Sequence, residues 1–199
     1  MNEYINYQYK RSNKKKLPNV FSKDQIIKFF NSVEETTVAM GCLLSFCTGL
    51  RIGEIVSLKW SNIDFEERRI KIVDGKTGDG YTDIPIKLIP IMKKWKYLTN
   101  NNEYFIPYKN KLHFSRLSRL SNGFQRASKN AGLLSIDRIL RDGKPRYRLT
   151  FHAWRHTFAT FLWEKTGDIY LVQKALRHSS VKTSEIYTHV SDPHKRDKM

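Results

Sequence analysis

The first third of the chain follows the spacing of helices, in which apolar residues return every three to four positions. Ser22, followed by Gln25, resembles a capping box, and the apolar stripe after it predicts the start of a helix. Residues 38–47 are apolar enough for a buried helix that breaks at Gly49, and residues 51–58 resume the helical spacing. We therefore expect three helices before the pattern changes.

Strand-like alternation of apolar and polar residues occurs in two places. Residues 69–73 and 82–86 alternate on either side of a segment dense in turn residues, which predicts a β-hairpin with Lys76 at or near its tip. Between residues 136 and 149, basic residues alternate around Gly143, which predicts a second, short hairpin.

The remaining segments return to helical spacing. Helices are predicted over residues 87–98 and 118–131, and further helices follow from Thr150 onward, one of which opens at Asp168 as its N-cap. The pattern shows no internal repeat and no low-complexity segment. It predicts an α+β fold that is mainly helical, with a small antiparallel β-hairpin or sheet on one edge.

The chain has 199 residues, of which 40% are hydrophobic, and this is enough for one good-sized core. Residues 1–17 are basic and lack an apolar period, so we expect a flexible arm or linker stub there. One principal domain is expected over residues 18–190, followed by a short polar tail at residues 191–199.

Charge is the strongest feature of the composition. Lys and Arg number 36 against 19 Asp and Glu, which gives a formal net charge of +17. Such an excess repels itself unless a polyanion neutralises it, so a nucleic-acid partner is expected ahead of an anionic membrane surface.

Targeting features are lacking in the printed sequence. No apolar run approaches the roughly eighteen residues that suggest a membrane span, and the N-terminus has no apolar signal-peptide core. Cys42 and Cys47 lie in an apolar segment without zinc or disulfide spacing, so we expect reduced core residues. We predict a cytoplasmic protein, or one that acts on a nucleoid or in a nucleus.

Several residues invite a chemical interpretation, but each also has an ordinary one. Arg51 with Glu54, and His152 with Arg155, are spaced to share a helix face, as surface ion pairs and solvated polar residues also do. Lys76 is by default a solvated turn residue. A histidine near a helix end commonly bonds the last carbonyls, and most tyrosines pack a ring and hydrogen-bond the hydroxyl.

The joint pattern is more specific than any of its parts. The strings TGLRIGEIVSLKWSNID, GKTGDGYTDIPI, FHAWRHTFAT and LVQKALRHSSVKTSEIYTHV occur in this order and resemble the boxes of the tyrosine recombinase (phage integrase) catalytic domain. The resemblance covers roughly residues 18 to 190 and implies the fold of that domain. The residues that match the family pattern are Arg51, Glu54, Lys76, His152, Arg155, His178 and Tyr187.

The resemblance implies a DNA strand transferase that needs no metal, cofactor or ATP. Tyr187 would attack a scissile phosphate, release a 5′-hydroxyl and keep the ester as a 3′-phosphotyrosyl bond, which splits one exchange into two reversible steps. Because a phenol with a pKa near 10 is mostly protonated at neutral pH, a base is required, and His152 is the candidate.

The other matched residues would serve the phosphate and the leaving group. Arg51 and Arg155 suit the non-bridging oxygens because a guanidinium donates bidentately and stays charged. His178 would donate a hydrogen bond to a phosphate oxygen, Lys76 would protonate the leaving 5′-oxygen, and Glu54 would orient its neighbours.

The chain departs from the usual family pattern in four respects. Arg177 stands where the family usually has glycine before the second histidine, the basic hairpin before His152 is longer than usual, and little follows Tyr187. The usual N-terminal helical domain is also missing from the printed residues. The expectation is a piece of a longer protein or a single-domain member.

The expected partner is double-stranded DNA, on which we expect self-association as a dimer or tetramer. Basic residues outside the catalytic pattern are then candidates for phosphate contacts. They are Lys14, Lys15, Lys16, Lys109, Lys111, Arg116, Arg119, Arg138, Arg141, Lys144, Arg146 and Arg177.

Two rival functions stay open at this point. A type IB topoisomerase shares the chemistry but relaxes supercoils, and the box spacing and small size favour the recombinase instead. A non-catalytic DNA-binding regulator on the same scaffold is disfavoured because all seven positions are filled.

Overall fold

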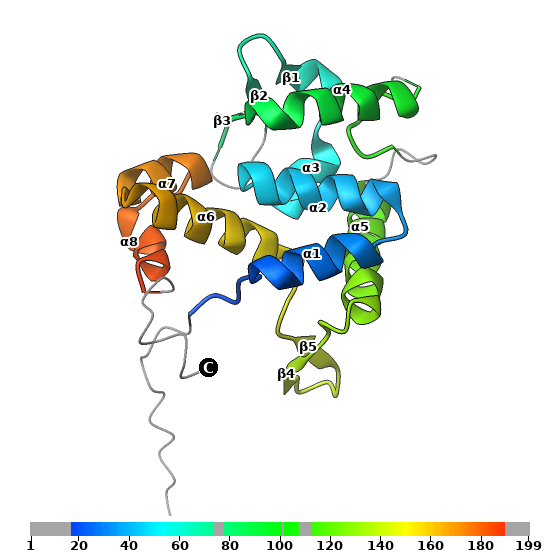
Figure 1. Ribbon diagram of the computed structural model, residues 1–199, viewed down its shortest axis with the longest axis vertical. Coiled ribbons are helices and arrows are strands. Elements are labelled where there is room, and N and C mark those ends of the chain that lie inside the picture. The colour runs from blue at the N-terminus through cyan, green and yellow to red at the C-terminus, as the bar shows by residue number, and fades with distance from the viewer. Residues whose placement is uncertain (1–16, 74–77, 101, 108–112, 190–199) are drawn as a thin grey trace, which may run out of the picture.

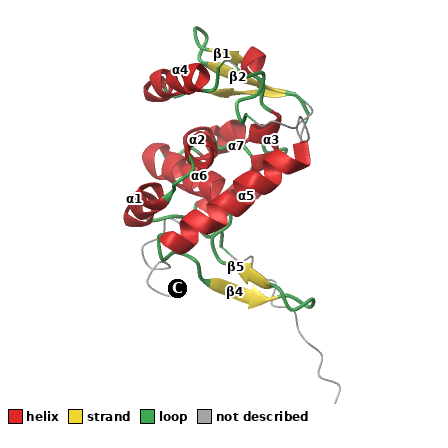
Figure 2. Cartoon of the chain, turned by 90° about the vertical axis from the view of Figure 1, so that its right-hand side faces the viewer, coloured by secondary structure: helices red, strands yellow, loops and turns green. Residues whose placement is uncertain are grey.

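The computed structural model describes residues 17–73, 78–100, 102–107 and 113–189 (Figure 1). Within them the chain is mainly helical, with two small antiparallel sheets at opposite ends of the molecule (Figure 2), which confirms the predicted α+β class. The α-helices are α1 (Lys23–Ser32), α2 (Thr36–Thr48), α3 (Ile52–Ser57), α4 (Ile89–Leu98), α5 (His113–Asn130), α6 (His152–Thr166), α7 (Ile169–Leu176) and α8 (Val181–Ser184). The 3₁₀ helices are η1 (Trp60–Asn62), η2 (Ile86–Leu88) and η3 (Glu185–Tyr187).

Both predicted hairpins are present. The first belongs to a three-stranded antiparallel sheet in the order β1-β2-β3, in which Ile72 pairs with Gly80. The second pairs β4 with β5 and extends away from the helices (Figure 2). The strands are β1 (Ile63–Asp64), β2 (Arg69–Ile72), β3 (Gly80–Asp83), β4 (Ile136–Ile139) and β5 (Pro145–Tyr147). Residues 74–77, and with them the predicted place of Lys76, lie outside the described residues.

Local sequence features begin and end the helices largely as predicted. Ser22 and Gln25 form the reciprocal capping box of α1, and Asp168 accepts hydrogen bonds from two backbone N–H groups at the start of α7. Gly49 ends α2 with a φ of 70°, where a Cβ would come within 2.6 Å of Phe158. The last predicted helix is instead divided into α8 and η3.

Helix α2 forms the centre of the molecule and packs against α3, α5 and α6. Its residues are apolar nearly all round, as expected for a helix covered on several sides. The approach of α5 depends on two glycines: a Cβ at Gly41 would lie 2.9 Å from Leu120, and a Cβ at Gly123 would collide with Val38. Close packing of α2 and α5 therefore requires the absence of these side chains.

Aromatic rings join the segment before α1 to α6. Phe21 stacks on Trp154 with 4.0 Å between ring centroids, and Phe29 and Phe124 pack edge-on or tilted around the pair. The Phe21 backbone N–H also donates to Thr157 Oγ1 at 2.9 Å. These rings are buried and belong to the core.

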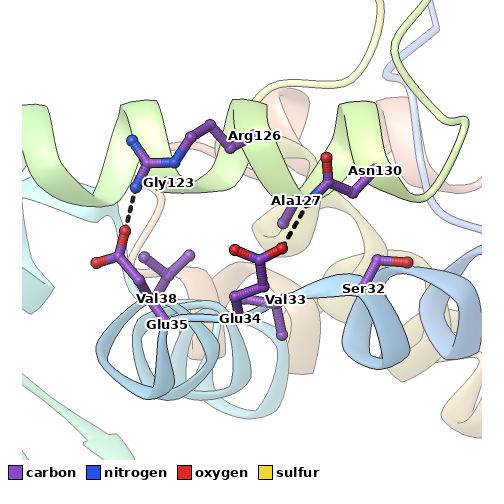
Figure 3. Close-up of a pocket in the computed structure, with 9 residues that line it drawn as sticks. All are labelled: Ser32, Val33, Glu34, Glu35, Val38, Gly123, Arg126, Ala127 and Asn130. Carbon is purple, nitrogen blue, oxygen red and sulfur yellow. Dashed lines mark hydrogen bonds and ion pairs between the residues drawn. The ribbon is translucent and has the colours of Figure 1, made fainter.

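Ion pairs fasten the corner between α1 and α2 to α5 (Figure 3). Glu35 accepts from Arg126 and from Arg119 Nε, the latter at 3.1 Å, and Glu34 accepts from Asn130 Nδ2 at 3.3 Å. Because these groups are partly exposed, each pair contributes at most about 1 kcal/mol. The contacts orient α5 more than they stabilise it.

Candidate active site

Arg51 and Glu54 lie at the N-terminal end of α3 and are joined by two hydrogen bonds. Glu54 Oε2 accepts from the Arg51 backbone N–H at 2.7 Å, and Glu54 Oε1 accepts from Arg51 Nη1 at 2.9 Å. A carboxylate in the first turn satisfies a backbone donor and suits the positive end of the helix dipole. This geometry suits the orienting role predicted for Glu54.

A second arginine reaches Glu54 from the other end of the chain. Arg177 Nη2 donates to Glu54 Oε2 at 2.7 Å, and the two side chains are only 10% and 6% exposed. Burial raises the pKa of the Glu54 carboxyl, but the Arg177 charge and the hydrogen bonds from both arginines outweigh burial, so the pKa lies below its ordinary value. The site therefore holds a carboxylate between two guanidinium groups.

Arg155 lies on α6 and is 1% exposed. Its Nη1 donates to the Gly49 carbonyl at 2.5 Å, and its Nη2 donates to the Leu176 carbonyl at 2.6 Å. Burial and the nearby Arg51 charge lower the pKa of Arg155 to about 10, so the guanidinium is still charged at neutral pH. The two carbonyls end α2 and α7, so Arg155 links three helices and is held in one orientation.

Two histidines follow each other by one turn on α6. The rings of His152 and His156 meet edge to face with 4.7 Å between centroids. Burial, together with the charges of Arg155 and Arg51, lowers the pKa of His152 to about 4 although the residue keeps solvent exposure. Burial above all lowers the pKa of His156 to about 3. Both imidazoles are neutral at physiological pH and can accept a proton.

His178 lies just after α7 and is held on both sides. Its backbone N–H donates to the Gln173 carbonyl at 3.0 Å, and its carbonyl accepts from Gln173 Nε2 at 3.0 Å. His178 Nδ1 forms a 2.8 Å hydrogen bond with the hydroxyl of Ser184, so Nε2 is the ring nitrogen left for another partner. Burial, with Arg155 and Arg51, lowers the pKa of His178 to about 4.

Tyr187 is buried at 1% exposure in η3, against α6 and α7. Its hydroxyl lies 3.0 Å from His156 Nδ1. Burial raises the pKa of Tyr187 to about 12, against the opposing effect of Arg155 and Arg51. The phenol is therefore neutral and enclosed in this arrangement, and it has to move to meet a bulky substrate.

The predicted catalytic groups lie close enough to shift one another's ionisation. The charges of Arg51 and Arg155 act on the pKa of His152, His178 and Tyr187. These groups come from the N-terminal end of α3, from α6 and from the segment after α7, and α6 contacts both α7 and η3. The cluster consists of Arg51, Glu54, His152, Arg155, His178 and Tyr187.

An open cavity of about 300 Å³ lies between β5 and the start of α6. Its lining includes both α6 histidines, together with Arg146 of β5 and Arg148 just after it. The polar residues that line it are Asn19, Asp137, Arg146, Tyr147, Arg148, Thr150, His152 and His156. The exposed side of the histidine pair therefore adjoins a space bordered by positive charge.

The predicted phosphate contacts fall into three groups. Lys14, Lys15, Lys16, Lys109 and Lys111 lie outside the described residues. Four others are exposed on the β4–β5 hairpin, namely Arg138, Arg141, Lys144 and Arg146. The remaining three have partners within the protein, and for two of them the expectation needs correction.

Arg116 is 3% exposed, donates from Nε to the Val56 carbonyl at 2.8 Å and lies 4.0 Å from the centroid of the Tyr104 ring. It supports the fold, so its predicted place on a DNA-binding surface is wrong. Arg177 is likewise not a surface residue, because it is directed to Glu54. Arg119 is half-buried and shares Glu35 with Arg126.

Two residues that contact the predicted catalytic groups, His156 and Ser184, were not predicted. His156 is four residues after His152, so helical spacing alone places the two on one face, and the sequence contained this signal. Ser184 had no such feature, because its contact with His178 depends on how α8 folds back on the end of α7.

In the described part of the chain, no three His, Cys, Asp or Glu side chains gather into a group that could hold a metal ion. No described helix combines the length and apolar character needed to cross a membrane. Cys42 is a buried free thiol and Cys47 a half-buried one packed against the core, so both lie where core cysteines were predicted.

Comparison with known proteins places these observations in a family. Residues 19–194 match the model of the phage integrase family. A tyrosine recombinase of Thermosipho africanus is 32% identical over 190 residues, which cover 92% of this chain and 62% of that protein. A solved XerA recombinase has a TM-score of 0.69 at 26% identity, over 92% of this chain and 65% of that one.

A second solved relative is a XerH site-specific recombinase bound to palindromic difH substrate in a post-cleavage complex. It has a TM-score of 0.62 at 27% identity, over 92% of this chain and 53% of that one. The chain thus spans roughly half to two thirds of the length of the proteins that it resembles.

Proposed function

Because the chain belongs to the phage integrase family, we propose that it cleaves and rejoins DNA at specific sites through a phosphotyrosyl intermediate on Tyr187. The observation that carries the proposal is that the guanidinium groups of Arg51 and Arg155 lie close enough to act on the Tyr187 phenol and on the imidazoles of His152 and His178. We propose residues 18–190 as the catalytic domain, residues 1–17 as a basic arm and residues 191–199 as a polar tail.

The proposed reaction is an in-line displacement at phosphorus. Tyr187 Oη forms a bond to the scissile phosphorus while the bond from phosphorus to the 5′-oxygen breaks. The phenolic proton goes to a histidine, and the leaving oxygen receives a proton from Lys76. The products are a 3′-phosphotyrosyl ester and a free 5′-hydroxyl, and attack by another 5′-hydroxyl reverses the step and joins a new strand.

The transition state gathers negative charge on the non-bridging oxygens, which Arg51 and Arg155 would neutralise. Arg155 uses one N–H of each terminal nitrogen on backbone carbonyls and keeps further donors for a phosphate. Glu54 holds Arg51 by Nη1, which leaves Nη2 and Nε. Such fixed donors need no reorganisation as charge develops, and His178 Nε2 would add one more. The proposed chemistry uses these side chains and requires no metal or ATP.

The proton of the phenol has two candidate acceptors. His152 is proposed as the general base, since it is neutral and adjoins the open cavity. His156 is its rival because it bonds the Tyr187 hydroxyl directly at 3.0 Å. We assign His156 to hold the phenol in the enclosed arrangement and His152 to act once the phenol meets phosphate. Replacing each histidine by alanine separates the two roles. Loss of the general base, which we assign to His152, lowers the rate of adduct formation at saturating DNA.

Double-stranded DNA is the proposed partner, with a dimer or tetramer assembling on it. The net charge of +17, the exposed basic β4–β5 hairpin and the substrate-bound state of the XerH relative support this partner. Sequence-specific strand exchange is preferred to the relaxation of supercoils by a topoisomerase because the similar proteins are recombinases.

A suicide substrate tests the proposal. A duplex of the cognate site, with a nick beside the scissile phosphate, is incubated with the protein in excess EDTA. We expect a protein–DNA adduct that survives denaturant and is absent from Tyr187→Phe, which keeps the ring and loses the nucleophile. An adduct that needs magnesium, or that persists in Tyr187→Phe, contradicts the assignment. Tyr170, an exposed tyrosine on α7, provides the control variant Tyr170→Phe.

A further inference from the structure

Arg177 has a backbone conformation that its residue type does not favour. It caps α7 with a φ of 52° and a ψ of 46°, in the left-handed region that glycine adopts readily and a residue with a Cβ does not. Its N–H donates to the carbonyls of Gln173 and Lys174 and closes the helix. A helix end of this kind uses only backbone groups, so it does not explain why the residue is an arginine.

The side chain connects two parts of the site. Its Nη2 bonds the Glu54 oxygen that also accepts from the Arg51 backbone, and the other Glu54 oxygen holds the Arg51 guanidinium. Arg177 is 123 residues from Glu54 and directly precedes His178. The Glu54 carboxylate therefore ties the segment that carries His178 to the helix end that carries Arg51.

The aliphatic part of the same side chain contacts the three-stranded sheet. A Cβ built on Gly80, the first residue of β3, would lie 2.9 Å from Arg177 Cδ, and the next nearest atoms, at 3.9 Å, also belong to Arg177. Gly80 pairs with Ile72 of β2, so this contact sets where the hairpin lies relative to α7. One side chain thus meets α3 and β3 from the end of α7.

The arrangement is not optimised for stability. Arg177 Nε and Nη1 are buried and have no hydrogen-bond partner within the described residues. Burying a charged group with unsatisfied donors costs free energy, and so does the left-handed backbone. Both costs are retained at a residue next to a predicted catalytic histidine, which favours a role in the site over a role in folding.

We propose that Arg177 is a positioning residue, which sets the distance between His178 and Arg51 through Glu54 and holds β3 against the end of α7. This inference rests on the proposed function for its effect on catalysis. Removing the Arg177 side chain shifts the two phosphate donors, His178 and Arg51, relative to each other but removes neither of them. The rate of cleavage is therefore affected more than the affinity for DNA.

Two substitutions separate the charge of Arg177 from its stem and backbone. Arg177→Met keeps an aliphatic side chain on a residue with the left-handed backbone but removes the ion pair with Glu54. We expect single-turnover adduct formation to slow by about 10- to 100-fold, as for a misplacement of catalytic groups by about 1 Å. DNA affinity should change by less than about 3-fold, since Arg177 is directed to Glu54 and not to a phosphate. Arg177→Lys restores a charge and should recover part of the rate.

Lys174→Met is the matched control, since Lys174 is an exposed cation on the same helix and the substitution removes the same charge. It should leave the rate of adduct formation unchanged. Equal rates for wild type, Arg177→Met and Arg177→Lys at saturating DNA would overturn the positioning role. So would a decrease in Arg177→Met that Lys174→Met reproduces.

A double-mutant cycle tests the packing of Arg177 on Gly80 without any activity. Gly80→Ala should lower the melting temperature in wild type, where the new methyl group meets Arg177, and should lower it much less in Arg177→Gly, where that side chain is gone. If the two changes are additive, this packing is refuted. If wild type forms no adduct but the coupling persists, the proposed function fails while the link between β3 and α7 stands.

Discussion

The cluster around Arg155 and the β4–β5 hairpin are both strongly basic, but they hold their charges in opposite ways. In the cluster, Arg155 is 1% exposed and bonds two carbonyls, and Arg51 and Arg177 share one carboxylate. On the hairpin, the side chains of Arg138 and Arg141 are exposed, and the two-stranded ribbon that carries them extends away from the helices (Figure 2).

The difference matters because a charge with a fixed orientation and an exposed charge have different functions. A charge held by fixed partners in a buried site can act on one atom of a substrate, since its orientation is settled before the substrate arrives. A charge on an exposed ribbon attracts a polyanion at long range and is screened by salt. Substitutions in the cluster should therefore change rates, and substitutions on the hairpin should change affinity.

The largest effect is expected from Arg155→Lys, which keeps the positive charge but removes the planar guanidinium group with its two terminal nitrogens. Lysine cannot bond the carbonyls of Gly49 and Leu176 and a phosphate together, so we expect adduct formation to fall by about 10²- to 10³-fold. Unfolding in urea should show a loss of about 1–3 kcal/mol for the carbonyls left without a partner. Arg141→Lys on the hairpin makes the same exchange and should change neither quantity. Equal effects at the two sites would refute the contrast.

Neutralising the hairpin tests the other half of the contrast. In the variant that replaces Arg138, Arg141, Lys144 and Arg146 by glutamine, we expect weaker DNA binding. The slope of log affinity against log salt should decrease by up to about 0.9 for each phosphate that is no longer neutralised. The rate of adduct formation at saturating DNA should stay within about 3-fold of wild type, because no transition-state donor is removed. An unchanged salt slope would show that the hairpin does not meet DNA.

His156, which forms a hydrogen bond with Tyr187 beside the cluster, makes stability depend on pH. His156 has a pKa of about 3 when folded against 6.5 as its ordinary value, so between these values the unfolded chain binds a proton that the folded chain does not. The free energy of unfolding therefore falls as the pH drops below about 6.5. Comparing urea unfolding at pH 7 and pH 5, we expect His156→Gln to reduce this fall by about 1–2 kcal/mol, allowing for a half-buried ring. An unchanged difference would contradict the neutral, enclosed imidazole.

The smallest effect is expected at Ser184, whose hydroxyl forms a hydrogen bond with His178 Nδ1. Ser184→Ala removes one hydrogen bond that orients the ring, so adduct formation should slow by about 2- to 10-fold. Ser184→Thr keeps the hydroxyl and should retain most of the rate. If alanine and threonine behave alike, the hydroxyl does not position His178.

Local chemistry made much of the fold predictable. The capping box at Ser22, the N-cap at Asp168 and the left-handed stop at Gly49 each act through neighbouring backbone groups, so the residues concerned are visible in a few letters of sequence. Both hairpins were also predicted, although the strand expected over residues 82–86 lies at Gly80–Asp83. Strand β1 was not, since two residues are too few to display an alternation.

The sequence predicted which residues form the site better than it predicted which groups those residues contact. Spacing alone indicated that Arg51 and Glu54 share a helix end, and the observed hydrogen bonds agree. His156 was missed although it shares a face with His152. Arg116 was predicted to lie on the surface because basic residues usually do. In the structure it is buried, where it donates a hydrogen bond to the Val56 carbonyl and lies over the Tyr104 ring.

The sequence by itself determined which residue types are available and where helices and turns begin, because those depend on interactions within a few residues. Only the tertiary structure decided that Arg177 meets Glu54 across 123 residues and that the Tyr187 hydroxyl is enclosed beside His156. Such contacts depend on how α3, α6 and α7 pack together. A guanidinium or a phenol has the same appearance in a sequence whether its partner is water or a buried carboxylate.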